Sequence, residues 1–466
     1  MSAEVKEQPK SLSFDEYDAI GFDVDHTLVK YKIPNLFNTM HDLMTDFLVS
    51  ERNYPEEMKK PFSHFKDLCV RGLILDKRHG IFLKLSENGF ILRATLGSTA
   101  LNDEQIQDIY GDGKIFPWFK DLIETVDNLP PRFRIFENFF DMPGIVVTAK
   151  VIDVALKDID IVKDEELVAK KMSTVESDVM DGFRHLYNHK NFADNKTFFK
   201  SLKEDPERFL EKTPEDVCQW LKKIRELNKV MFIVTSAYHD CAKFVLDHAY
   251  GTEWTDLFDF NATLARKPAF FSGSNPMYEV NDEGGHGSVV HEMKPNVTYL
   301  QGNKEILMKA LKKKTGKDQP KILFFGDSLR SDVFPSKRFA DWDNFLILEE
   351  MEAEDWEFHE HFEDSPKIKK YKSTEPSQDE KEYLTSLSWG SLFTDGKSCD
   401  DSPEPCMNTL WGYIIRKYAD VAVPQLQYIA KLPMDHKFAV FNHESVRQWG
   451  FFPRRPNALE NRSSRK

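Results

Sequence analysis

Four short apolar runs stand out along the chain, and each of them ends in a polar residue that can take part in chemistry. The runs are AIGFD (Ala19–Asp23), VMFIVT (Val230–Thr235), FDFNATLARK (Phe258–Lys267) and KILFFGD (Lys321–Asp327). The first, second and fourth are continuous apolar segments, which is typical of strands buried on both faces of a parallel sheet. The third is patchier, but it fits the same series.

Helical patterns fill the spaces between these predicted strands. Residues 213–229 carry an apolar stripe behind Thr213 as N-cap, Pro214 at the first helical position and Asp216 at the capping-box site. Residues 239–251 and 303–316 predict two more helices, each ending at a glycine. Alternation of strand and helix predicts an α/β fold with a doubly wound, mostly parallel sheet, and ligands of such sheets bind beyond the carboxyl ends of the strands.

The segment 35–212 interrupts this alternation between the first and second predicted strands. Within it, the alternating residues of 71–97 around Glu87-Asn88-Gly89 predict a β-hairpin, and the rest has a mainly helical pattern. We therefore expect a large, mainly helical cap inserted after the first core strand. The expected division of the chain is a catalytic core at 14–34 and 213–350, a cap at 35–212, a mobile loop at 365–383, and a C-terminal section at 384–455 packed on the core.

Composition and charge narrow the choice of partners and compartment. The chain has 466 residues and a formal net charge of −14, which argues against a general nucleic-acid binder, because phosphate contacts need clustered Lys and Arg. Its five cysteines are widely spread and form no C-x-x-C pair, so they predict no disulfide framework. No signal peptide and no apolar run of membrane-spanning length is visible, so we expect a cytoplasmic protein without a membrane partner. Formation of a homo-oligomer is left open.

The polar ends of the predicted strands carry the candidate chemistry. Asp23 and Asp25, with Thr27, form a D-x-D-x-T triplet directly after the first run. Asp327 ends the fourth run and Asp332 follows five residues later. Acids that meet at one edge of a sheet repel each other unless a cation lies between them, and carboxylate oxygens are ligands that Mg²⁺ prefers. These acids predict a Mg²⁺ and phosphate site.

Each of these residues also has a purely structural interpretation. Thr235 alone is more often a strand-terminal cap than a phosphate ligand, and Lys267 could be a solvated lysine before Pro268. Asp332 could serve as a helix N-cap. His26 is expected to pack or orient neighbours rather than to act in proton transfer.

The four motifs, taken in this order, resemble the haloacid dehalogenase superfamily of phosphohydrolases. That pattern is D-x-D-x-T, then Thr or Ser after a strand, then Lys, then G-D-x(4)-D, and it is matched at Asp23, Asp25, Thr235, Lys267, Asp327 and Asp332. Longer stretches, including GFDVDHTLVKY, RGLILDKRHGIFLKL, FFDMPG, ARKPAFF and FFGDSLRSD, resemble the cytosolic purine 5′-nucleotidase family over most of 14–350. The resemblance implies a Rossmann-like haloacid dehalogenase core and Mg²⁺-dependent hydrolysis of nucleoside 5′-monophosphates, with purines favoured.

The resemblance also implies a role for each matched residue. Asp23 would attack phosphorus to form an aspartyl phosphate, and Asp25 would act as acid and then base. Asp23, the backbone carbonyl of Asp25 and Asp327 would ligate Mg²⁺. Thr235 and Lys267 would bind the phosphoryl oxygens, and Asp332 would orient a metal-bound water or Lys267.

Two other functions remain open at this point, and a third is disfavoured. The first is a phosphatase of another phosphorylated metabolite, because the cap and not the core selects the leaving group. The second is a nucleotide-binding or scaffold protein of low activity that keeps the fold. A receiver-type signalling domain also uses Asp, Thr and Lys, but a domain of about 125 residues has no cap insertion, and the length of this chain argues against it.

Overall fold

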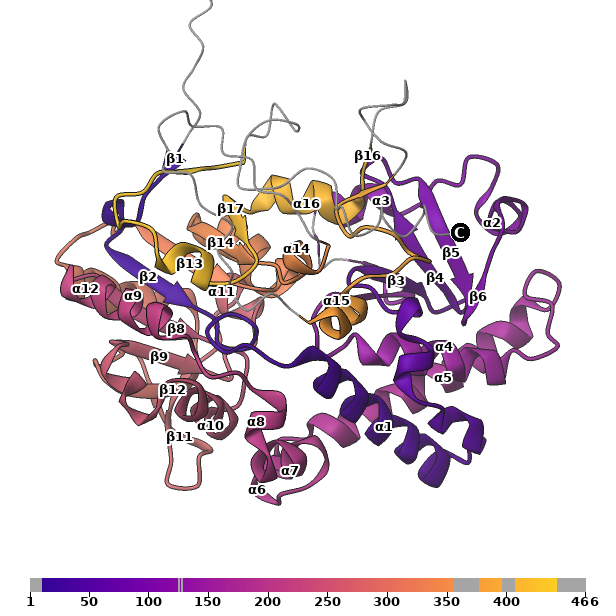
Figure 1. Cartoon of the computed structure of the whole chain (residues 1–466), viewed down its shortest axis with the longest axis horizontal. Helices are drawn as coiled ribbons and strands as arrows, with labels where there is room; N and C mark the ends of the chain where they lie inside the picture. Colours follow the sequence, from indigo (N-terminus) through magenta and orange to yellow (C-terminus); the bar gives the residue numbers. More distant parts are fainter. Residues whose placement is uncertain (1–10, 125, 127–128, 355–376, 396–406, 442–466) are drawn as a thin grey trace, which may run out of the picture.

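The structure is a computed structural model of the chain and describes residues 11–124, 126, 129–354, 377–395 and 407–441. The fold is α/β, with one large, mostly parallel sheet, a smaller antiparallel sheet and many helices (Figure 1). Within the described ranges no helix is both long and apolar enough to cross a membrane.

The large sheet has nine strands, and the four predicted strands lie next to one another at its centre. From edge to edge the strands are β11 (His286–Val290), β10 (Met277–Val280), β12 (Val297–Gln301), β9 (Phe260–Thr263), β8 (Val230–Val234), β2 (Ala19–Phe22), β13 (Ile322–Gly326), β14 (Asp343–Ile347) and β17 (Val421–Val423). All neighbouring pairs from β12 to β17 are parallel, whereas β10 pairs antiparallel with both β11 and β12. The prediction of a mostly parallel sheet is confirmed.

Central strand β2 is apolar throughout because both faces of the sheet are covered. Ile20 and Phe22 belong to one buried cluster and Ala19 to another, as expected when successive side chains point to opposite faces. Gly21 allows close packing here, since an added Cβ atom would lie 2.2 Å from the ring of Phe232. Such packing fixes the position of the strand end, where the predicted chemistry begins.

Helices lie against both faces of the large sheet. Residues of α9 (Glu215–Glu226) and α10 (His239–Tyr250) join the cluster that contains Phe22, and residues of α11 (Ala269–Ser272) and α12 (Lys304–Thr315) join the cluster that contains Ala19. The predicted boundaries of α10 and α12 are confirmed, with Gly251 and Gly316 as their C-caps. The short helices η5 (Thr252–Asp256), η6 (Leu329–Val333) and α13 (Phe334–Ala340) complete this part of the chain.

The predicted N-terminal cap of α9 is wrong by one residue. The N-cap is Pro214, which has no side-chain acceptor, and the helix begins at Glu215. The backbone N–H of Thr213 instead donates to the carbonyl of Ala249, so tertiary contact overrides the local capping pattern.

The segment between β2 and β8 contains helices and the second sheet. Its helices are α1 (Ile33–Arg52), η2 (Glu56–Lys59), η3 (Phe62–His64), η4 (Lys66–Leu68), α2 (Asp103–Tyr110), α3 (Phe119–Glu124), α4 (Pro143–Ala155), α5 (Glu165–Tyr187), α6 (Lys190–Ala193), α7 (Thr197–Glu204) and α8 (Pro206–Phe209). Helices α1, α4 and α5 pack on one another beside the large sheet, in the lower right of Figure 1.

The predicted hairpin is present, but it is part of a larger antiparallel sheet. Strands β4 (Ile81–Leu85) and β5 (Ile91–Leu96) pair antiparallel, and Gly89 in their turn has a φ of +79°. The sheet also includes β6 (Thr99–Ala100), β3 (Leu73–Asp76) and β7 (Phe133–Phe136), in the order β6-β5-β4-β3-β7. The predicted hairpin therefore accounts for only two of the five strands of this sheet.

The C-terminal section supplies one edge strand of the large sheet and a strand that pairs near the start of the chain. Strand β17 follows α16 (Leu410–Tyr418) and pairs parallel with β14, while β18 (Phe438–Ala439) pairs with β1 (Ser11–Leu12) near the start of the chain. The remaining elements are η1 (Phe14–Glu16), α14 (Glu350–Ala353), α15 (Gln378–Leu384), β15 (Thr394–Asp395), β16 (Met407–Asn408) and α17 (Gln427–Ala430).

The predicted mobile loop at 365–383 is wrong in its last part. Residues 378–384 form helix α15, which Ser377 and Glu380 begin with a reciprocal capping box. Residues 365–376 lie outside the described ranges, as do 396–406 and 442–455 of the predicted C-terminal section.

Candidate active site

The predicted site residues come together at one edge of the large sheet. Strands β9, β8, β2 and β13 are neighbours and run parallel, so their carboxyl ends lie at the same edge. Asp23 follows β2, Thr235 follows β8, Lys267 lies in the loop after β9, and Asp327 follows β13. The sheet order therefore collects four segments that are far apart in the sequence.

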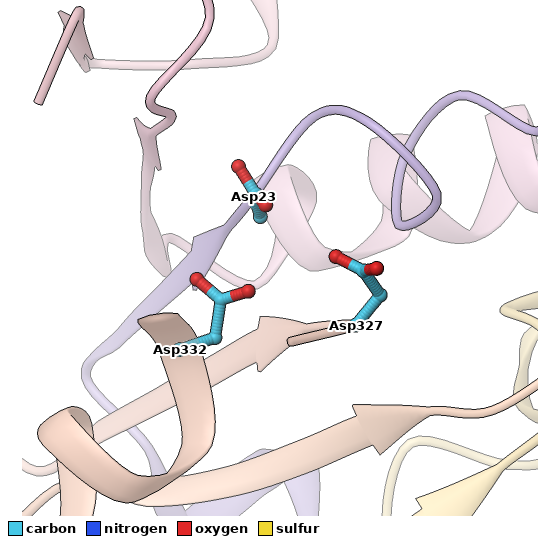
Figure 2. Close-up of side chains that lie close together, drawn as sticks. All are labelled: Asp23, Asp327 and Asp332. Atoms are coloured by element: carbon cyan, nitrogen blue, oxygen red, sulfur yellow. The ribbon is translucent and has the colours of Figure 1, made fainter. Parts of the chain in front are cut away.

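Three carboxylates form the centre of this site. Oxygen atoms of Asp23, Asp327 and Asp332 all lie within 4.8 Å of one another, and all three residues are buried. Figure 2 shows Asp23 and Asp327 at the ends of neighbouring strands, with Asp332 on the following helical turn and directed toward the same space. Asp332 is not the N-cap of that turn, because Ser328 has that role.

Lys267 lies between two of these acids. Its Nζ atom is 2.8 Å from Oδ1 of Asp23 and 2.5 Å from Oδ1 of Asp332. Burial would lower the pKa of Lys267, but the charges of Asp23 and Asp332 outweigh it and raise the pKa above its usual range. The side chain is 1 % exposed, so the alternative of a solvated lysine is excluded.

Two buried cations do not balance the buried carboxylates at this site. Lys267 is shared by Asp23 and Asp332, and Arg71, whose Nη2 atom lies 3.9 Å from Oδ2 of Asp327, is shared with Glu350. Burial raises the pKa of Asp327 well above its usual range in spite of the charge of Arg71, and the charges of Asp332 and Asp23 add to the increase. Burial, with the charge of Asp23, also raises the pKa of Asp332 to about 7 in spite of Lys267. Carboxyl groups placed this way have a strong affinity for further positive charge.

Asp25 lies beside the cluster but is not part of it. Its Oδ1 atom accepts a hydrogen bond of 2.7 Å from the hydroxyl of Tyr31. Burial and the charge of Asp23 raise the pKa of Asp25, which favours the protonated form that a general acid needs. The expected role of its backbone carbonyl in metal binding stays a prediction.

The loops after β8 and β9 are joined to each other at the site. Ser236 Oγ accepts a hydrogen bond from the backbone N–H of Lys267, and Thr235 Oγ1 accepts one from that of Ala237. Leu264 and Arg266 have φ values of 49° and 54°, a left-handed conformation that is uncommon for such residues and that costs free energy. The strained loop turns sharply enough to bring Lys267 to Asp23.

His26 has the packing role that the sequence indicates. It is 3 % exposed, its ring stacks on Tyr31 and contacts Phe139, and its Nδ1 atom lies 3.2 Å from Oε1 of Glu349. The loop after β2 is thereby fixed to the segment that follows β14.

The sequence interpretation missed a buried arginine behind the cluster. Arg71 lies just before β3, and its Nη1 atom donates to the backbone carbonyl of Asp327 at 3.1 Å. Its Nε atom is 2.8 Å from Oε1 of Glu350, and the guanidinium lies over the ring of Phe139. The available signal was a lone arginine at the start of the apolar run RGLILD.

A buried glutamate supports the same loop from the other side. Glu137 accepts hydrogen bonds from Ser328 Oγ and from the backbone N–H of Leu329. Glu137 and Arg71 both come from the segment between β2 and β8, so this segment fixes the backbone on both sides of Ser328 and carries part of the site.

The geometry describes a site of three buried carboxylates around a lysine, and comparison with known proteins gives the class of the protein. The model of the 5′ nucleotidase family matches residues 8–402. The chain belongs to the 5′ nucleotidase family and is an enzyme of that class.

Relatives of the chain narrow the comparison within this family. The 5′-nucleotidase domain-containing protein 1 of Homo sapiens is 31% identical over 448 residues, covering 95% of this chain and 96% of that protein. The protein of the same name from Bos taurus is 31% identical over 450 residues, with the same coverage. The 5′-nucleotidase domain-containing protein 2 of Rattus norvegicus is 23% identical over 350 residues, covering 74% of this chain and 59% of that protein. The family resemblance of the sequence motifs is confirmed.

Proposed function

We propose that the chain is a Mg²⁺-dependent phosphomonoesterase that hydrolyses nucleoside 5′-monophosphates, with purines favoured, through an aspartyl phosphate on Asp23. The observation that carries this proposal is the cluster of Asp23, Asp327 and Asp332 around Lys267 at the carboxyl edge of the sheet. Membership of the 5′ nucleotidase family supports hydrolysis of nucleoside 5′-monophosphates in general. The nine-stranded sheet, in which β2 and β8 are neighbours although a long segment separates them in the chain, supports a haloacid dehalogenase-like core with a cap.

The residues present fit a magnesium ion. Asp23 and Asp327 offer hard carboxylate oxygens, within 4.8 Å of each other, at the ends of two adjacent strands. Asp332, which shares Lys267 with Asp23, would orient the lysine or a metal-bound water. When bound, Mg²⁺ would neutralise the crowded carboxylates and the charge of the substrate phosphate.

The first half-reaction transfers the phosphoryl group to the protein. A carboxylate oxygen of Asp23 attacks phosphorus and forms an O–P bond, while the bond between phosphorus and the 5′-oxygen breaks. Asp25 gives its proton to the departing 5′-oxygen, so the nucleoside leaves as a neutral alcohol. Lys267 and the hydroxyl of Thr235 bind the phosphoryl oxygens and offset the charge that develops there.

The second half-reaction restores the protein. Asp25, now a carboxylate, accepts a proton from a water molecule whose oxygen attacks phosphorus. The O–P bond to Asp23 breaks, inorganic phosphate leaves, and Asp25 is protonated again for the next cycle. The sum is one ester and one water converted into one alcohol and one phosphate.

Choice of a nucleotide over other phosphate esters is supported by the inserted segment and by the relatives. In the segment between β2 and β8, the rings of Tyr31, Phe139 and Phe140 pack around His26. Tyr31 and Phe139 are buried, whereas Phe140 is only partly buried. Cysteines 69, 218 and 241 are free thiols, which fits the reducing cytoplasm that we propose as the location.

A phosphate-release screen tests the substrate class. We expect kcat/KM for at least one purine nucleoside 5′-monophosphate to exceed that for the matching 3′-monophosphate and for sugar phosphates by about tenfold. If a sugar phosphate or a phosphopeptide is the better substrate, the hypothesis of a nucleotidase is refuted, whereas the hypothesis of a phosphatase stands. If nothing is hydrolysed but a nucleotide raises the melting temperature, the binding-protein alternative is correct.

Removal of the metal tests the cofactor. Activity should disappear in excess chelator and return with added Mg²⁺, because the clustered side chains are oxygen ligands only. Full turnover in excess chelator would contradict the metal role of Asp23 and Asp327.

A further inference from the structure

The hydroxyl group of Tyr31 makes a direct contact with the side chain that we expect to move the proton. It donates a hydrogen bond of 2.7 Å to Oδ1 of Asp25. Among the described residues, no other group donates a hydrogen bond to this carboxyl. Asp25 is half-buried, and in the described part of the chain its hydrogen bond is made through Oδ1 and not through Oδ2.

The ring of Tyr31 is held by His26, in the loop after β2, and by Phe140, in the inserted segment. It is 2 % exposed, stacks on His26 at 4.8 Å, and meets the edge of Phe140 at 5.4 Å. A side chain confined in this way loses little entropy when its hydroxyl forms a hydrogen bond, so the bond is well placed to fix Asp25.

The backbone of Tyr31 is fixed as well. Tyr31 pairs antiparallel with Leu210, and hydrogen bonds join Lys32 N–H to the carbonyl of Phe209 and Glu211 N–H to that of Lys30. These are the two points where the chain leaves the large sheet for the inserted segment and returns from it. Tyr31 therefore lies at the junction and reaches from it to Asp25.

Tyr31 is suited to be a donor at all working pH values. Burial, together with the charge of Asp25, raises the pKa of Tyr31 well above its usual range, so the hydroxyl keeps its proton. Its hydrogen can point to only one acceptor at a time, and the geometry directs it to Oδ1.

We propose that Tyr31 is a positioning residue for general acid catalysis: its hydroxyl holds Oδ1 of Asp25 so that Oδ2 carries the proton to the leaving 5′-oxygen. This inference rests on the proposed phosphomonoesterase function. Tyr31 itself gives up no proton and forms no bond to the substrate.

Removal of the Tyr31 hydroxyl should therefore lower kcat/KM by a factor that depends on the leaving group of the substrate. A departing alkoxide needs the proton of Asp25, whereas a departing thiolate is much less basic and leaves without it. Since kcat/KM includes every step up to departure of the nucleoside, it reports the acid step and excludes the later attack of water. Misplacement of Asp25 should slow an oxygen ester and spare its sulfur counterpart.

The test compares two substrates that differ in one atom. One is guanosine 5′-monophosphate, and the other is its analogue with sulfur in place of the bridging 5′-oxygen. For Tyr31→Phe we expect kcat/KM to fall about tenfold with the oxygen ester and less than twofold with the sulfur analogue. The ratio of the two values does not depend on the fraction of folded enzyme, so partial misfolding of the variant does not obscure it.

Tyr17→Phe is the matched control. The hydroxyl of Tyr17 donates to Oδ2 of Asp343 at 2.9 Å, in an equally buried position before β2 rather than after it. This variant loses the same kind of bond and should leave the ratio of the two substrates unchanged.

The outcomes separate the inference from the function on which it rests. Equal losses with both substrates, or no loss with either, would overturn the role of Tyr31 alone. If the wild-type protein releases phosphate from neither substrate, the proposed function fails, and the inference fails with it.

Discussion

A single buried carboxyl group should make the stability of this protein depend on pH. Glu354 is 1 % exposed, and it accepts hydrogen bonds from Ser391 Oγ at 2.7 Å and from the backbone N–H of Leu392 at 2.8 Å. Burial raises the pKa of Glu354 to about 7, although both hydrogen bonds and Lys84 oppose the shift. Glu354 thus joins the end of α14 to the C-terminal section at Ser391 and Leu392.

The sign and the size follow from proton linkage. At pH values between the pKa of Glu354 in the unfolded chain and its pKa of about 7 in the folded protein, the folded protein binds more protons than the unfolded chain. The contribution of Glu354 to the free energy of unfolding is therefore largest at low pH and is lost as the pH rises. The unfolded value for Glu is about 4.3, and each pKa unit corresponds to about 1.36 kcal/mol. From pH 5 to pH 8 the loss from this group amounts to about 2.5 kcal/mol.

Urea unfolding of the wild-type protein and of Glu354→Gln at both pH values measures this loss. Glutamine keeps an acceptor for Ser391 and Leu392 but has no charge, so the variant should gain about 2.5 kcal/mol over the wild type between pH 5 and pH 8. Glu226→Gln on the exposed end of α9 is the control and should show no such gain. A constant difference between wild type and Glu354→Gln at the two pH values would refute the reasoning.

Three further predictions concern the site. Asp25→Asn should impair both half-reactions and let phosphoenzyme accumulate, which quenched samples would show as protein-bound phosphate; phosphate-free protein with normal turnover would contradict its role. Lys267→Met leaves two buried carboxylates without their cation, so we expect at least a hundredfold loss of kcat and about 3 kcal/mol less stability in urea. Arg71→Met leaves Glu350 unpaired and should also cost about 3 kcal/mol, with Arg71→Lys costing less; an unchanged midpoint would refute its structural role.

The core strands that the sequence predicted most clearly are those whose burial is complete. β2, β8 and β13 have every residue buried, so their sequences are continuously apolar and easy to recognise. Strands β10 and β11, at one edge, alternate or expose their residues, and β17 has only three residues. Short or half-exposed segments become strands through pairing with neighbours, and a local pattern does not contain that information.

The residues of the site also differ in how far the sequence could predict them. Asp23, Asp327 and Asp332 lie in short local motifs beside strong strands, so spacing and position predicted them. Arg71 has its acceptor, the carbonyl of Asp327, 256 residues away along the chain. That contact depends on how the inserted segment packs against the sheet, and no local pattern around Arg71 specifies it.

Phosphate release from guanosine 5′-monophosphate, measured in parallel for the wild-type protein and Asp23→Asn with Mg²⁺, is the most direct test of the central claim. Asparagine keeps the size of the side chain and relieves the crowding of like charges, so the variant should remain folded. We predict turnover by the wild type and none detectable for Asp23→Asn, because no nucleophile remains. A variant with a tenth of the wild-type rate would contradict covalent catalysis through Asp23, and an inactive wild type would contradict the proposed hydrolysis of this nucleotide.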